Sequence, residues 1–174
     1  MYLRKILSPD YIGHFLIYTN FMSLEKLLRP IYSVFGIGYI KIGSGTFCSL
    51  LACLIILIFG ENIEFFARLI ILLIILPIGF MSTNFRFEKD NAELKDPNFV
   101  VIDEFIGMWI VLLIVDNSIL LISLSFLLFR FFDITKLLGI HKIEKLNGSL
   151  GIILDDVFAG LYSLIIIYII KFIF

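Results

Sequence analysis

The feature that most constrains this chain is a series of long apolar runs separated by polar segments. The runs occupy residues 47–59, 65–82, 99–115, 119–132 and 157–174. A transmembrane helix needs ~20 consecutive apolar residues, or ~17 at the short end, and these runs reach or approach that length. Hydrophobic residues make up 60% of the 174 residues, well above the ~45–50% typical of soluble domains. We therefore predict an all-α fold, a polytopic membrane helical bundle with about four to five transmembrane helices.

The length of the chain suggests a single membrane-embedded domain over residues 1–174. Residues 1–35 are predicted to form an N-terminal interfacial segment, because residues 21–32 have an amphipathic, charged pattern. The polar motifs lie within a core at 36–160, and the last membrane helix is expected at 157–174. Cys48 and Cys53 lie in an apolar run and are expected to be buried thiols.

The placement of the few charges gives the chain a predicted orientation. The net charge is −1, so bulk charge offers no case for binding nucleic acid. Lysines and arginines concentrate in segments 84–98 and 134–149, which counting the spans places on one side of the membrane. The positive-inside rule makes that side cytoplasmic.

The same counting brings three separated groups of ionisable residues to this cytoplasmic end. The groups are Asp103 and Glu104; Arg130, Asp133 and Lys136; and Asp155 and Asp156. Arg130 and Asp133 are three residues apart, so on a helix they share a face. Ionisable groups in membrane segments are costly and survive near helix ends, in wet cavities or in pairs.

Carboxylates outnumber bases in these groups, which suggests a site for a divalent cation. Asp103, Glu104, Asp133, Asp155 and Asp156 offer the hard oxygen ligands that suit Mg²⁺ or Mn²⁺. Arg130 and Lys136 are then candidates to bind a phosphate. Glycines 36, 38, 43 and 45 would let backbone N–H groups approach an anion at the start of the first span, although this pattern alone is a weak signal. Any single pair could instead be a helix cap or an internal salt bridge.

Two other residues of the third run are open to interpretation. Gly107 lies one turn beyond Glu104, and we predict that it lets a neighbouring helix pack closely there. Trp109 has no evident functional role. His141 is expected to be a solvated loop residue.

Four ordered motifs resemble one known family. The stretches are "GIGYIKIGSGTFCSL", "DPNFVVIDEFIGMW", "FRFFDITK" and "NGSLGIILDDVFAG". In order and spacing they resemble the phosphatidylglycerophosphatase A family, from about Gly36 to Gly160. The chain departs from the family pattern at Lys41 and Ser44, where prolines are usual, and at several other loop positions. These departures concern loop rigidity more than charge.

The resemblance implies a Mg²⁺-dependent membrane enzyme of phospholipid biosynthesis. It would remove the terminal phosphate of phosphatidylglycerophosphate, giving phosphatidylglycerol, with its site on the cytoplasmic face of the bacterial inner membrane. Carried over by position, its catalytic residues are Asp103, Glu104, Arg130, Asp133, Lys136, Asp155 and Asp156. Gly45, Thr46 and Ser49 match the first motif, and Lys41 adds a further candidate phosphate contact beside Arg130 and Lys136.

Other functions stay open at this point. A small ion transporter or channel would use the carboxylates to line a cation path, but it predicts ionisable residues throughout the depth of the membrane. Another lipid phosphatase, or a phosphatidyltransferase, would also use membrane carboxylates and Mg²⁺; the usual signature of the transferases within one segment is missing. A structural membrane subunit is the remaining option. The general base is left open between Asp103 and Glu104.

Overall fold

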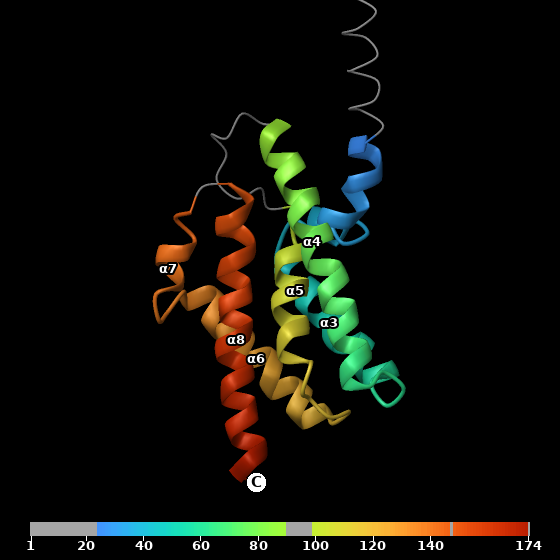
Figure 1. Cartoon of the computed structure of the whole chain (residues 1–174), viewed down its shortest axis with the longest axis vertical. Helices are drawn as coiled ribbons and strands as arrows, with labels where there is room; N and C mark the ends of the chain where they lie inside the picture. Colours follow the sequence, from blue (N-terminus) through green and yellow to red (C-terminus); the bar gives the residue numbers. More distant parts are fainter. Residues whose placement is uncertain (1–23, 90–98, 147, 174) are drawn as a thin grey trace, which may run out of the picture.

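The computed structural model describes residues 24–89, 99–146 and 148–173, and over these residues it contains helices and no strands. A helical segment at 24–32 is followed by a short 3-10 helix, η1 (Ile37–Tyr39). The α-helices after it are α3 (Ser44–Phe59), α4 (Phe65–Lys89), α5 (Ile102–Val111), α6 (Ile119–Thr135), α7 (Ile140–Ile143) and α8 (Ser149–Ile173) (Figure 1). The predicted all-α class is confirmed.

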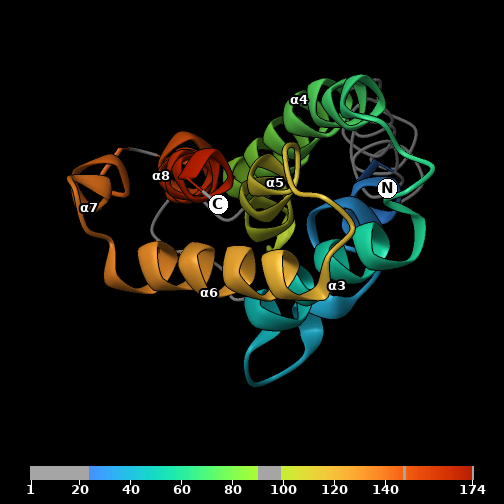
Figure 2. The same ribbon diagram turned by 90° about the horizontal axis from the view of Figure 1, so that it is seen from below.

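Helix α5 is the centre of the bundle. Figure 2 shows it enclosed by α3, α4, α6 and α8, and it packs against all four. Ile106, Met108 and Val111 of α5 are completely buried. A helix that is apolar on every side must be covered on every side, and here the cover is protein.

The predicted number of membrane helices is wrong. Within the described part of the chain, two helices are long and apolar enough to cross a membrane, at Phe65–Arg86 and Ser149–Ile173. The run at 99–115 was predicted to span, but its helix has only 10 residues, because 99–101 precede it as non-helical chain and turns follow from 112. Helices α3 and α6 have 16 and 17 residues, which is at the lower limit of the ~17–25 residues that cross a bilayer, and they are not among the two helices named above. A short apolar helix is more often a buried core helix than a span, and α5 is one.

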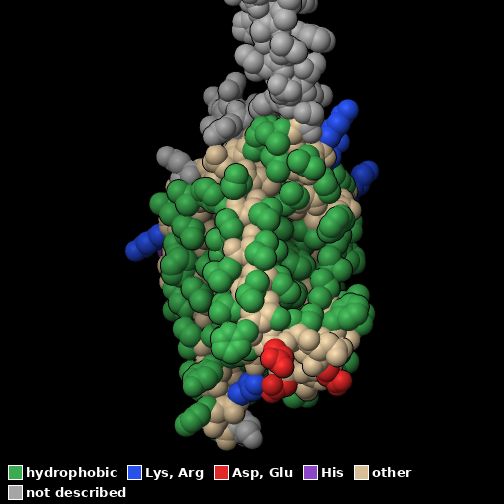
Figure 3. All heavy atoms as spheres, turned by 45° about the vertical axis from the view of Figure 1, so that its right-hand side comes forward, with side chains coloured by type: hydrophobic (Ala, Val, Ile, Leu, Met, Phe, Trp, Pro, Cys, Tyr) green, Lys and Arg blue, Asp and Glu red, His purple; other side chains and the backbone are tan. Residues whose placement is uncertain are grey.

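The outer surface of the bundle is strongly apolar. Figure 3 shows hydrophobic side chains over most of the visible face, with charged groups at its edges and towards its lower end. Large apolar side chains point outward from several helices, among them Phe66 and Leu73 on α4, Leu120 on α6 and Phe172 on α8. A continuous apolar surface of this kind marks an interaction surface, and together with α4 and α8 it favours association with a membrane.

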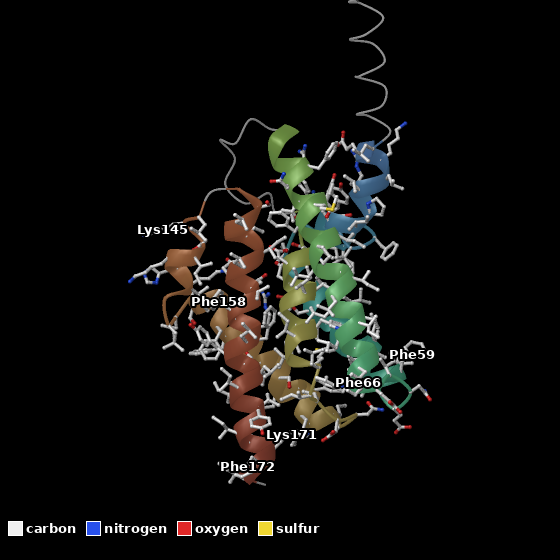
Figure 4. The ribbon with its side chains drawn as sticks, viewed as in Figure 1. Phe59, Phe66, Lys145, Phe158, Lys171 and Phe172 are labelled. Carbon is white, nitrogen blue, oxygen red and sulfur yellow. The ribbon has the colours of Figure 1, made fainter. Side chains whose placement is uncertain are left out.

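The end of the molecule where α3 joins α4 is held by one buried arginine. Arg68 donates hydrogen bonds to the carbonyls of Gly60, Ile63, Leu112 and Val115, at distances between 2.6 and 2.9 Å. The indole of Trp109 donates to the carbonyl of Arg68 at 3.0 Å, which gives this residue the structural role that the sequence did not reveal. Figure 4 shows Phe59 and Phe66 at the same end.

Residues 1–23 of the predicted N-terminal interfacial segment lie outside the described residues. Residues 90–98 of the segment 84–98 also lie outside them. In the described helical segment, Leu27 is exposed whereas Glu25 and Tyr32 are buried. The carbonyl of Tyr32 accepts a hydrogen bond from the N–H of Val101 at 2.9 Å, so this segment ends against the start of α5. The division of the chain at residue 35 stays a prediction.

Candidate active site

Asp103 and Glu104 lie in the first turn of α5. The residue before that helix, Val101, is held from two sides: its N–H donates to the Tyr32 carbonyl and its carbonyl accepts from the Cys48 thiol, each at 2.9 Å. The positive end of the helix dipole stabilises acidic side chains in a first turn. Since Asp103 is buried, the local structure holds carboxylate groups inside the protein.

A carboxylate from a second helix completes a cluster. One carboxylate oxygen from each of Asp103, Glu104 and Asp156 lies within 4.8 Å of the others, and Asp156 is buried in α8. Glu104 Oε2 and Asp156 Oδ1 are buried and make no hydrogen bond with the described residues. Several buried carboxylates at such distances repel one another and need a compensating positive charge. We call these three residues the carboxylate cluster.

Basic side chains from the end of α6 lie beside the cluster. Arg130 Nη1 is 2.5 Å from Asp133 Oδ2, so these two residues share a face as predicted. The ammonium group of Lys136 is 3.3 Å from Asp133 Oδ1 and 4.0 Å from Asp156 Oδ1, and it forms a close ion pair with Asp155. The structure therefore brings all seven predicted charged residues to one place, and it pairs Asp133 and Asp155 with lysine.

The backbone conformation at the end of α6 directs Lys136 towards these acids. Lys136 has a left-handed conformation with φ +49°, and its N–H donates to the carbonyl of Phe132 at 2.9 Å. Burial lowers the pKa of Lys136, but the carboxylates of Asp156 and Asp155 raise it by more than burial lowers it. The pKa of Lys136 is therefore above its usual value. Lys136 therefore keeps its positive charge throughout the neutral pH range.

Arg130 retains a hydrogen-bond donor for a ligand. Its Nε atom is buried and makes no hydrogen bond with the described residues, whereas Nη1 lies in the ion pair with Asp133. A guanidinium group presents its donors in a planar fork that matches the oxygens of a phosphate. Arg130 and Lys136 together form a positively charged wall beside the carboxylate cluster.

The start of α3 closes another side of the site. Gly43 precedes the helix in a left-handed conformation, with φ +73°. A Cβ atom on Gly45 would lie 2.0 Å from Oε1 of Glu104, so only glycine lets the first turn of α3 approach this carboxylate. The glycine pattern that the sequence left as a weak signal therefore has a concrete reason at position 45.

A close crossing of α5 and α8 sets the distance between the carboxylates. A Cβ on Gly107 would lie 2.6 Å from the carbonyl oxygen of Asp156, and a Cβ on Gly160 would lie 2.4 Å from the carbonyl oxygen of Gly107. The predicted close packing at Gly107 is confirmed. Its partner Gly160 was missed, although it ends the fourth motif and could have been found as the small residue one turn after Asp156.

The remaining predicted phosphate contacts lie in α3 or in the turn before it. Ser49 is completely buried and donates its hydroxyl to the carbonyl of Gly45 at 2.9 Å, so this hydroxyl is engaged within α3. Thr46 is half-buried in the first turn of α3, and Lys41 is exposed in the turn before it. Their roles as phosphate contacts stay predictions.

Helix α7 takes no part in the cluster. His141 is exposed, as expected, but it lies in α7 and not in a loop. Figure 4 shows Lys145 beside α7, away from α5.

Fold and site together define a class of protein: an apolar helical bundle with buried carboxylates and basic groups suited to binding an anionic group and a cation. Comparison with known proteins narrows this class. The family model described as Phosphatidylglycerophosphatase A matches residues 31–171. The chain belongs to the phosphatidylglycerophosphatase A family, and it is a phospholipid phosphatase.

Relatives from several bacteria resemble the chain over much of its length. A Haemophilus influenzae protein named Phosphatidylglycerophosphatase A is 34% identical over 88% of this chain and 96% of its own length. A Bacteroides thetaiotaomicron protein named "Putative phosphatidylinositol-3-phosphatase" is 37% identical over 76% of this chain and 86% of its own. The Escherichia coli protein named Phosphatidylglycerophosphatase A is 36% identical over 43% of this chain and 45% of its own. No solved structure matches the chain.

Proposed function

We propose that this protein is a Mg²⁺-dependent phosphatase that removes the terminal phosphate of phosphatidylglycerophosphate to give phosphatidylglycerol and inorganic phosphate. One observation carries the proposal: three carboxylates within 4.8 Å of one another stand beside Arg130 and Lys136. Membership of the phosphatidylglycerophosphatase A family supports the choice of substrate.

The residues of the carboxylate cluster fit a divalent cation. Glu104 Oε2 and Asp156 Oδ1 are buried oxygens without a hydrogen-bond partner among the described residues, and Mg²⁺ prefers oxygen ligands of this kind. Asp103, Glu104 and Asp156 would hold the ion, while Asp133 and Asp155 are engaged by Lys136. When bound, a divalent cation supplies Lewis-acid stabilisation of the charge on phosphoryl oxygens.

The side chains around the cluster divide the work of hydrolysis. Arg130 and Lys136 bind the phosphate oxygens and stabilise the charge that spreads over them during phosphoryl transfer. Asp103 or Glu104 takes the proton of the attacking water as its oxygen bonds to phosphorus and the bond from phosphorus to the glycerol oxygen breaks. This carboxylic acid then gives the proton to the leaving glycerol oxygen, which completes phosphatidylglycerol and restores the carboxylate.

We further propose that the protein is an integral protein of the bacterial inner membrane with this site at the cytoplasmic face. The apolar outer surface and the two long apolar helices support a membrane location. The concentration of basic residues in segments 84–98 and 134–149 supports the orientation through the positive-inside rule.

Phosphate release from a panel of lipid phosphomonoesters by the purified protein in detergent tests the proposal. We expect release from phosphatidylglycerophosphate with Mg²⁺, none after chelation, and a loss of at least about 10²-fold in Asp103→Asn and Asp156→Asn. Glu61→Gln, an exposed substitution where α3 joins α4, is the matched control and should keep full activity. Full activity with chelator, or in both site variants, would refute the assignment; cation flux without lipid hydrolysis would favour a transporter.

A second substrate is favoured by one relative. The Bacteroides thetaiotaomicron protein carries a name that specifies phosphatidylinositol 3-phosphate chemistry, and it covers most of this chain. Both lipids present a phosphomonoester on a polar headgroup. The panel therefore includes phosphatidylinositol 3-phosphate, and a higher kcat/KM for that lipid would replace the substrate proposed above.

A further inference from the structure

An apolar groove runs along the outside of the bundle between α3 and α6, and the active-site residues do not account for it. Its volume is about 640 Å³. Its walls include Phe47, Leu50 and Leu54 of α3 and Ile119, Ser123 and Leu127 of α6. Figure 2 shows α3 beside the first part of α6, and the two helices are in contact. Volumes of roughly 300–1,000 Å³ with mostly apolar walls are typical of ligand sites.

On α6 the groove leads to the proposed phosphate site. Ile119, Ser123 and Leu127 recur every four residues, so they form one stripe along the helix. Arg130 is three residues beyond Leu127 and continues the stripe, at a distance of about 5 Å along the axis. The apolar wall therefore ends where the positively charged wall begins.

On α3 the groove reaches the same level of the bundle. Its α3 wall begins at Phe47, which lies about 3 Å along the helix axis from Gly45, the glycine that contacts the carboxylate of Glu104, but on another face of the helix. The groove opens to the outside of the bundle rather than to its interior, because Leu50 and Leu54 of its α3 wall and Ile119 of its α6 wall are exposed. The α6 wall thus connects the apolar outer surface with the site, and the α3 wall faces it across the groove.

We infer that this groove binds a hydrocarbon chain of the phospholipid substrate, which enters sideways from the bilayer between α3 and α6. The inference rests on the proposed function, because it assumes that the substrate carries its phosphate to Arg130 and Lys136. A phospholipid needs an apolar site and an anionic site next to each other, and the groove and Arg130 provide them on one helix face. The small side chain of Ser123 keeps the α6 wall open.

Substitutions at Ser123 test the groove on the enzyme itself. Ser123→Trp fills the groove, whereas Ser123→Ala leaves its volume and is the matched control; Leu73→Trp adds the same bulk on the exposed face of α4. Each full-length variant is assayed on long-chain phosphatidylglycerophosphate and on its short-chain dihexanoyl form. We expect kcat/KM of Ser123→Trp to fall about tenfold or more on the long-chain lipid and to stay unchanged on the short-chain one.

Other outcomes overturn the inference. An equal loss on both lipids would show that the groove only supports the fold, and no loss on either would show that it does not bind substrate. A larger loss in Leu73→Trp than in Ser123→Trp would place the lipid elsewhere.

Photo-crosslinking separates failure of this inference from failure of the proposed function. Phosphatidylglycerophosphate with a diazirine on one acyl chain is irradiated with the protein, and labelled peptides are mapped by mass spectrometry. We expect labels on the groove walls of α3 and α6, and fewer of them in Ser123→Trp. Labelling there without hydrolysis would support the groove and refute the proposed function. Labels spread evenly over the outer helices, or crosslinks between two copies of the chain through this groove, would overturn the inference.

Discussion

Gly45 lies against the carboxylate of Glu104, so adding one methyl group there perturbs the site at a known place. In Gly45→Ala the new Cβ would lie 2.0 Å from Oε1 and 2.7 Å from Cδ of Glu104. Close contacts between carbon and oxygen have a length of about 3.3 Å, so the carboxylate oxygen must move by roughly 1.3 Å. Because it is the end of a flexible side chain, it can move without disturbing the backbone.

This displacement predicts a large loss of activity with little loss of stability. A misplacement of about 1 Å in a catalytic constellation can reduce the rate about 10²-fold, which corresponds to ~2.7 kcal/mol of transition-state stabilisation. Alanine is also the better helix former, by up to about 1 kcal/mol relative to glycine. We therefore expect kcat/KM of Gly45→Ala to fall about 10²-fold while its thermal unfolding in detergent changes by no more than a few degrees.

Phosphate release from phosphatidylglycerophosphate, measured beside thermal unfolding, checks this prediction. Gly79→Ala is the matched control, since its Cβ would meet the apolar side chains of Ile106 at 2.8 Å and Ile102 at 3.1 Å, and its three nearest atoms include no carboxylate. In the double variant Gly45→Ala/Glu104→Asp the shorter acid makes room, so the second substitution should cost much less than it does alone. Full activity in Gly45→Ala, or an equal loss in Gly79→Ala, would refute the reasoning.

Three further substitutions probe the ion pairs and the packing. Lys136→Met should reduce phosphate release about 10²-fold, because the phosphate loses one of its two cationic partners. Arg68→Met leaves four carbonyls without their donor and should cost about 3 kcal/mol or more in thermal stability, with normal turnover per folded molecule. Gly160→Ala places a Cβ 2.4 Å from the Gly107 carbonyl oxygen and should destabilise by about 1–3 kcal/mol, with lower activity, because it separates α5 from α8. Unchanged melting in either of the last two variants, or unchanged phosphate release in the first, would contradict these assignments.

The gathering of Asp103, Arg130 and Asp155 in one place could be predicted from the sequence because apolar runs that reverse direction bring alternate ends together. That reasoning needs only the direction of each helix, not its full length. It therefore succeeded even though the predicted number of spans was wrong. Apolar content alone does not distinguish a helix covered by lipid from one covered by protein, which is why α5 was predicted to span.

The internal arrangement of the site could not be predicted from the sequence. Asp155 and Asp156 are neighbours, yet one is engaged by Lys136 and the other belongs to the carboxylate cluster. This division depends on the rotation of α8 against α5 and on the left-handed conformation of Lys136. Likewise, Ser49 matched a motif, but its hydroxyl bonds to the Gly45 carbonyl within α3. Tertiary contacts decide such details, and spacing in the sequence carries no information on them.

Binding of Mn²⁺ to the purified protein, followed by electron paramagnetic resonance, tests whether the carboxylate cluster holds a divalent cation. Mn²⁺ accepts the same hard oxygen ligands as Mg²⁺ and reports binding without turnover. We expect the wild-type protein and Glu61→Gln to bind Mn²⁺, Asp156→Asn to bind it at least about tenfold more weakly, and Mg²⁺ to compete. No binding of Mn²⁺ to the wild-type protein, or equally tight binding to Asp156→Asn, would contradict a metal site at the carboxylate cluster.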